Sequence, residues 1–80
     1  MGAQLATGTD LNTIASFGIY YYHDRVTDLI NAPASAGMYM MLYVIPRAIG
    51  TRVIQIMCTN AGMFYRCQQS ADQFYDWQTL

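Results

Sequence analysis

Three residues of the types used in nucleophilic catalysis occur in this chain: His23, Asp24 directly after it, and Cys58 further along. A thiol, an imidazole and a carboxylate form a catalytic triad when a fold brings them into contact. The local pattern argues against this, because His23 follows a predicted strand and no glycine-rich elbow marks an oxyanion hole. We therefore predict that the chain is not an enzyme, with a small hydrolase or polysaccharide-degrading domain as the alternative.

Metal-binding and acid–base residues are sparse. Asp24 and Asp28 are four residues apart and Asn31 follows, but this loop lacks the dense oxygen spacing of a calcium site. Cys58 and Cys67 are the only cysteines and have no CxxC or Cys/His spacing. No pair of carboxylates is placed to act as the acid and base of a glycosidase. The sequence therefore predicts no metal, no cofactor and no catalytic residue.

Ligand binding has better candidates than catalysis. Gln55 and Arg66 can hydrogen-bond polar groups, while Tyr75 and Trp77 can stack on sugar rings. These four residues form the predicted ligand-binding patch, and Trp77 can also cover Arg66 through a cation–π contact. The alternative is a Gln–Arg pair that satisfies itself across two strands on the solvent face.

The composition is unusually apolar for so short a chain. Apolar residues make up 54% of the 80 residues and charged residues 11%, with no Lys and no Glu. A domain of this size buries a small share of its surface, so the surplus predicts contact with a partner. The net charge of −1 without a basic cluster argues against nucleic acid and membrane surfaces. The longest apolar run, residues 38–45, is too short to cross a bilayer, so we expect a soluble protein without a signal peptide.

The elements that must position these residues are short strands. Residues 59–62, Thr-Asn-Ala-Gly, are the best turn signal and predict a hairpin between strands at 51–58 and 63–68. Aromatic and β-branched residues predict further strands at 17–22 and 38–45, the second covered on both faces, and a short terminal strand or arm at 74–80.

The remaining segments are predicted to be irregular. Residues 1–8 have the character of a linker or cloning remnant, and the domain is expected to span residues 9–80. The stretch 24–37 is predicted to be a long loop with at most one helical turn, and Gly50 to close a turn. The predicted fold is mostly β, α+β at most, with a small antiparallel sheet of four to five strands.

The hairpin register sorts side chains by face. With the loop at 59–62, Cys58 lies opposite Met63, and Gln55 lies opposite Arg66. One face carries Ile54, Ile56, Cys58, Met63, Tyr65 and Cys67, and the other carries Val53, Gln55, Met57, Phe64, Arg66 and Gln68. We expect the first, more apolar face to be the core. The two cysteines lie roughly 13 Å apart on it, too far for a disulfide, so they are expected to be reduced and buried.

Several short motifs follow one another along the chain in a particular order. The first half carries Gly-Thr-Asp-Leu-Asn-Thr-Ile at 8–14, Gly-Ile-Tyr-Tyr at 18–21, Asn-Ala-Pro at 31–33, and Gly37 before an apolar strand. The second half carries Gln55, then Tyr65-Arg66, and ends with Trp-Gln-Thr-Leu at 77–80.

In this order the motifs resemble the knob domain of phage tail fibres and R-type pyocin fibres, whose later pattern is Gln, Tyr-x-Arg and Trp-x-x-Leu. The resemblance covers nearly the whole chain from Gly8 onward. The chain departs from the family pattern in its longer loop at 23–30 and its Met-rich second strand.

The resemblance implies a non-catalytic module near the distal part of a homotrimeric fibre. Such a module helps attach a phage or bacteriocin to the bacterial surface, often to polysaccharide, and belongs to a virion or phage-tail-like particle assembled in the bacterial cytoplasm. A trimer within a longer fibre would also account for the surplus of apolar residues. The alternative in the same class is a structural spacer that contacts no receptor.

Overall fold

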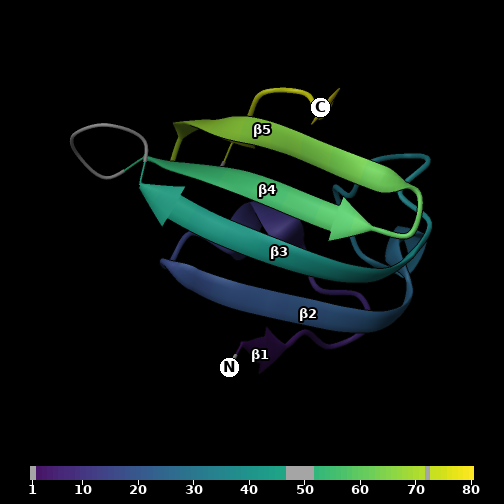
Figure 1. The fold of residues 1–80 in the computed structure, drawn as a ribbon. Coiled ribbons are helices and arrows are strands. Elements are labelled where there is room, and N and C mark those ends of the chain that lie inside the picture. Colours follow the sequence, from purple (N-terminus) through teal and green to yellow (C-terminus); the bar gives the residue numbers. More distant parts are fainter. Residues whose placement is uncertain (1, 47–51, 72) are drawn as a thin grey trace.

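The computed structural model describes residues 2–46, 52–71 and 73–80, and its backbone forms one open mixed sheet (Figure 1). Four long strands make up its centre: β2 (Gly18–Arg25), β3 (Met38–Pro46), β4 (Val53–Thr59) and β5 (Gly62–Ser70). Three two-residue strands extend it, β1 (Ala3–Gln4), β6 (Gln73–Phe74) and β7 (Gln78–Thr79). Two 3-10 turns, η1 (Leu11–Thr13) and η2 (Val26–Asp28), are the only helical elements within the described ranges. The predicted mostly β fold is confirmed.

The sheet differs from the prediction in its edges. Its order is β1-β2-β3-β4-β5-β6, with β7 also paired to β5, and β1 runs parallel to β2 while the other pairs are antiparallel. The strand predicted at 74–80 is divided into β6 and β7, and β1 was missed because two residues carry no periodic signal. The turn predicted at Gly50 and the start of the strand predicted at 51–58 lie outside the described residues, as do Met1 and Asp72.

The N-terminal segment is joined to the sheet and is not the linker that its composition predicted. Ala3 and Gln4 pair with Tyr20 and Tyr21 of β2, and the Leu5 N–H donates to the Tyr21 carbonyl at 2.9 Å. The Leu5 side chain is buried in the core. Residues 2–5 are therefore held by backbone pairing together with one apolar anchor.

The hairpin between β4 and β5 has the predicted register. Thr59 pairs with Gly62, which leaves Asn60 and Ala61 as the loop. The Asn60 side chain accepts a hydrogen bond from the Met38 N–H at 2.9 Å and so ties the turn to the start of β3. Gly37 has a φ of 78° and lies so close to Asn60 that a Cβ there would collide with it, which explains the glycine at this position.

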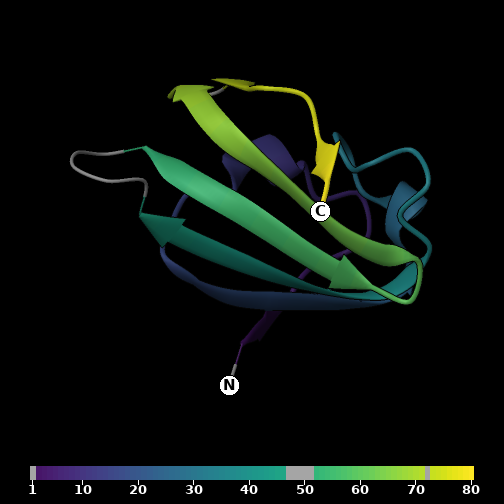
Figure 2. The same ribbon diagram turned by 45° about the horizontal axis from the view of Figure 1, so that its top comes forward.

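The prediction of which face forms the core is wrong. The buried apolar residues come from the face with Val53, Met57 and Phe64, together with the loops packed on it: Leu5, Leu11, Tyr22, Val26, Leu29, Ala36, Met40, Leu42, Val44, Val53, Met57 and Phe64. Figures 1 and 2 show η1 on this side of the sheet. We call it the covered face. The alternation of side chains along a strand predicts which residues share a face, but it does not show which face the loops will cover.

The opposite side, which we call the open face, has no described element packed over it (Figure 1). It carries Ile19, Ile45 and Met63, exposed by 40%, 40% and 46%. Strand β3 is therefore covered on one face only, contrary to prediction. Cys58 and Cys67 are free cysteines as expected, but they are half-buried on the open face and not in the core.

Candidate functional site

A glutamine and an arginine lie at the centre of the covered face. Strands β4 and β5 place Gln55 directly opposite Arg66, and the Arg66 Nε donates to the Gln55 Oε1 at 2.9 Å. The Gln55 Nε2 donates to the carbonyls of Leu11 and Ile14 at 2.8 and 2.9 Å. Gln55 is 0% exposed and Arg66 5%. The pair is thus joined as predicted, but it is buried beneath η1 and not on the solvent face.

Two aromatic rings from the C-terminal arm contact the guanidinium. The Arg66 Cζ lies 4.1 Å from the ring centroid of Phe74 and 4.5 Å from that of Trp77. The Trp77 indole Nε1 donates to the Asn31 carbonyl at 2.8 Å, which fastens the arm to the loop before β3. The Trp77 contact follows the prediction from the sequence. Phe74 was missed, because nothing in the sequence shows how the arm crosses β5.

The charge on Arg66 has no ion-pair partner in the described part of the chain. Burial lowers the pKa of its guanidinium to about 10, an effect that the nearby Asp10 opposes, so the group stays charged at neutral pH. An ion pair elsewhere joins Arg25, at the end of β2, to Asp28 of η2 at 3.9 Å. Among the described residues, the buried Arg66 Nη2 has no hydrogen-bond partner. Leaving a buried donor unmet costs about 1–3 kcal/mol, more for a charged group.

Asp10 organises the rim beside this guanidinium. Its Oδ1 accepts from the Asn31 Nδ2 at 2.8 Å and from the Asn12 N–H at 2.9 Å, which caps η1. These two hydrogen bonds lower the pKa of Asp10, and the bond from Asn31 has the larger effect. The positive charge of Arg66 lowers this pKa further, by a smaller amount. The carboxylate thereby holds two loops together at the edge of the site.

A cavity of about 210 Å³ opens at this point. It is lined by Asn12, Asn31, Ala32, Arg66, Phe74, Tyr75, Asp76 and Trp77. Three of the four predicted patch residues therefore line one cavity, while Gln55 lies behind Arg66 and holds it. Asn12, Asn31 and Asp76 were missed as site residues. The two asparagines belong to motifs of the resemblance, but only the folded loops bring them to the cavity.

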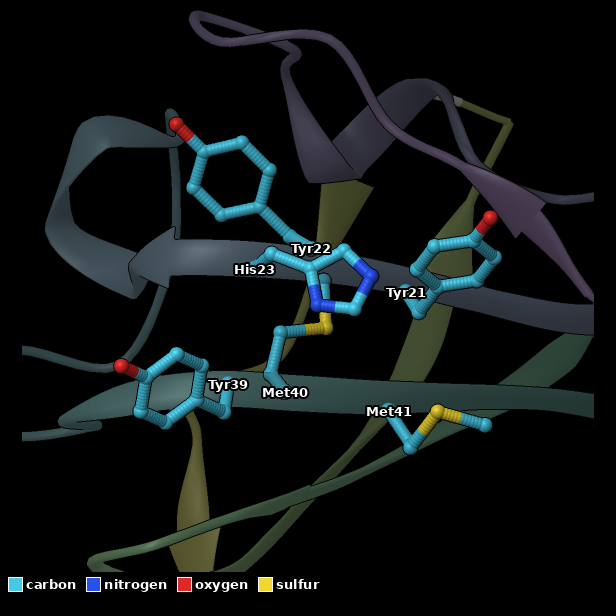
Figure 3. Close-up of a pocket in the computed structure, with 6 residues that line it drawn as sticks. All are labelled: Tyr21, Tyr22, His23, Tyr39, Met40 and Met41. Carbon is cyan, nitrogen blue, oxygen red and sulfur yellow. The ribbon is translucent and has the colours of Figure 1, made fainter.

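A second, larger cavity of about 300 Å³ is lined by residues of β2 and β3 (Figure 3). It is lined by Tyr21, Tyr22, His23, Tyr39, Met40 and Met41, where the β2–β3 register shifts between Tyr22 and Arg25. The rings of Tyr21 and His23 meet edge to face at 5.0 Å. Apart from His23 and the tyrosine hydroxyls this cavity is apolar, so the Arg66 cavity has the better set of convergent polar groups.

The residues considered for catalysis are not assembled. His23 lies on β2 and Cys58 on β4, with β3 between them, so their backbones are about 10 Å apart at the usual strand spacing. Asp24 accepts a hydrogen bond from the Arg25 N–H at 2.8 Å. Within the described ranges, no three His, Cys, Asp or Glu residues are grouped as metal ligands. No helix in those ranges is long and apolar enough to cross a membrane.

Comparison of the chain with family models, with curated proteins and with solved structures gives no match.

Proposed function

We propose that this chain is a non-catalytic attachment module of a phage or bacteriocin tail fibre, and that the Arg66 cavity holds one residue of a bacterial surface polysaccharide. The motif order of the sequence supports the fibre setting. On this proposal the protein belongs to a virion or tail-like particle, where the module forms part of a homotrimer. The chemistry of the residues that line the cavity supports a glycan as its ligand.

The observation that carries the proposal is the grouping of aromatic, amide, carboxylate and guanidinium side chains around one cavity. Tyr75 and Trp77 offer ring faces to a sugar, while Asn31 and Asp76 offer polar groups to its hydroxyls. The volume of about 210 Å³ is below that of sites for drug-sized ligands, which fits a single sugar residue of a longer chain.

Two tyrosines with similar exposure provide the test. Tyr75 is 54% exposed at the Arg66 cavity, and Tyr39 is 59% exposed at the apolar cavity. We expect Tyr75→Ala to weaken binding to host cells or to a glycan array roughly tenfold, because ring–sugar contact is lost, and Tyr39→Ala to leave binding unchanged. The reverse result would move the site to the cavity between β2 and β3, and equal binding by both variants would contradict the proposal.

The second candidate function is a structural spacer of the fibre, and the open face favours it. Monomeric proteins rarely expose apolar patches beyond a few hundred Å². Here Ile19, Ile45 and Met63 are exposed on the open face, and Ile54, Ile56 and Tyr65 on the same face are half-buried. Packing of copies through this face would bury it, which suits a homotrimer.

Sedimentation equilibrium tests this packing with a matched pair of isoleucines. Ile45 is 40% exposed on the open face, and Ile30 is 52% exposed in the loop before β3. We expect the wild type to associate at about 100 µM, Ile45→Asp to become monomeric because an interface would bury an unpaired charge, and Ile30→Asp to behave as wild type. A monomeric wild type would contradict the packing. If the parent fibre binds cells but this chain does not, the spacer is favoured over attachment.

A further inference from the structure

The guanidinium of Arg66 is only partly satisfied by the protein. The Gln55 Oε1 accepts a hydrogen bond from Nε, and the rings of Phe74 and Trp77 make cation–π contacts with the group. Nη2 has no hydrogen-bond partner in the described part of the chain, although the Arg66 side chain is buried, with only 5% of its surface exposed. The polar contacts still open to this side chain are therefore those of its Nη edge.

Arg66 lines the 210 Å³ cavity. Phe74 and Trp77, whose rings contact its guanidinium, line the cavity as well, so the charged end of the side chain lies beside it. A planar guanidinium matches a carboxylate through two parallel hydrogen bonds. Such bonds are strong where water is excluded.

We propose that the Arg66 cavity selects a sugar residue bearing a carboxylate, a hexuronic acid or a similar acidic sugar, with the carboxylate bound at the Nη edge of Arg66. The inference rests on the proposed attachment function and adds the charged group of the ligand. The acid supplies an acceptor to the Arg66 Nη2, which has no hydrogen-bond partner in the described part of the chain. The sugar ring then lies toward Tyr75 and Trp77.

Asp76 sets the orientation of this ligand. Asp10 accepts from Asn31 and Asn12 through its Oδ1, and no hydrogen bond joins it to the Arg66 Nη2 in the described part of the chain. Asp76 is exposed on the cavity lining, where it can accept from sugar hydroxyls but repels a second carboxylate. The acidic group must therefore point toward Arg66 and away from Asp76.

The chain contains a single tryptophan, which makes the test direct. Trp77 lines the cavity, so its fluorescence and its one indole N–H resonance report on ligand binding to the intact chain. The probes are sodium glucuronate and its neutral isostere glucuronamide, titrated at constant ionic strength. We expect glucuronate to bind at least about tenfold more tightly, because a hydrogen bond to a charged group is lost in the amide. Equal response to both probes, or no response to either, overturns the inference.

Variants and a third probe sharpen the result. Arg66→Gln should abolish the preference for the acid, and Asp76→Asn, on the exposed rim, should strengthen glucuronate binding a few-fold. The wild-type comparison of acid and amide stands even if Arg66→Gln does not fold. Inorganic phosphate that competes as well as glucuronate would overturn the assignment to a carboxylate. Binding of cells or neutral glycans that depends on Tyr75, without acid preference, would leave the attachment function standing and remove this inference alone.

Discussion

The two faces of the sheet each carry residues that are unusual for their position, polar side chains within the buried core on one face and exposed apolar side chains on the other. The covered face buries Gln55, Arg66 and Gln68, whereas the open face exposes Ile45 and Met63. Each buried glutamine makes hydrogen bonds at both ends of its amide, Gln68 with the Val53 N–H and the Ala71 carbonyl. Buried polar groups are tolerated when they are paired in this way. The buried glutamines of the covered face are thus satisfied within the chain, while the open face keeps apolar side chains exposed.

The largest expected effect comes from breaking the buried polar pair. Gln55→Leu removes the acceptor of the Arg66 Nε and both donors to the Leu11 and Ile14 carbonyls. Since a buried charge then loses its partner, we expect a loss of about 3 kcal/mol or more in the free energy of unfolding, measured by urea denaturation.

The double variant Gln55→Leu/Arg66→Met is the control for this effect. Replacing both partners by apolar groups leaves no unpaired charge, so it should recover at least about 1 kcal/mol relative to Gln55→Leu alone. A Gln55→Leu variant as stable as wild type would mean that the pair does not hold η1 to the sheet.

Neighbouring residues on β4 compare the two faces directly. Met57 is 0% exposed on the covered face, and Ile56 is half-buried on the open face. At a concentration where the chain is monomeric, we expect Met57→Ala to lower the unfolding free energy by about 2–5 kcal/mol because it leaves a cavity in the core. Ile56→Ala should cost about 1 kcal/mol, because water already reaches that site. A larger loss from Ile56→Ala would show that the open face carries the core after all.

Much of the fold could be predicted because strands and turns leave local signals. The turn at Asn60 and Gly62 fixes a register that places Gln55 opposite Arg66, and the structure has this pairing. The choice of core face failed because it depends on long-range packing. The face with Gln55 and Arg66 looks less apolar, yet the carbonyls of η1 and the rings of the arm compensate its polar groups.

The candidate site was predictable only in part, for the same reason. Arg66, Tyr75 and Trp77 stood out by residue type, and they do line one cavity. Asn31 lies 35 positions before Arg66 in the sequence and reaches the rim through hydrogen bonds to Asp10 and Trp77. No local pattern contains those two contacts, because each joins segments more than 20 residues apart.

The smallest expected effect tests the rim of the covered face through its pH dependence. The hydrogen bonds from Asn31 and Asn12 lower the pKa of Asp10 below its ordinary value near 3.9. A carboxyl whose folded-state pKa is lowered stabilises the fold above that ordinary value, and the stabilisation is lost as the pH falls through the folded pKa. Asp10→Asn keeps an oxygen that can accept both hydrogen bonds but cannot titrate. Between pH 6 and pH 2.5 the thermal midpoint of the wild type should therefore fall further than that of Asp10→Asn. Parallel curves would show that the Asp10 charge does not stabilise this rim, and that the loops beside Arg66 are held by neutral contacts alone.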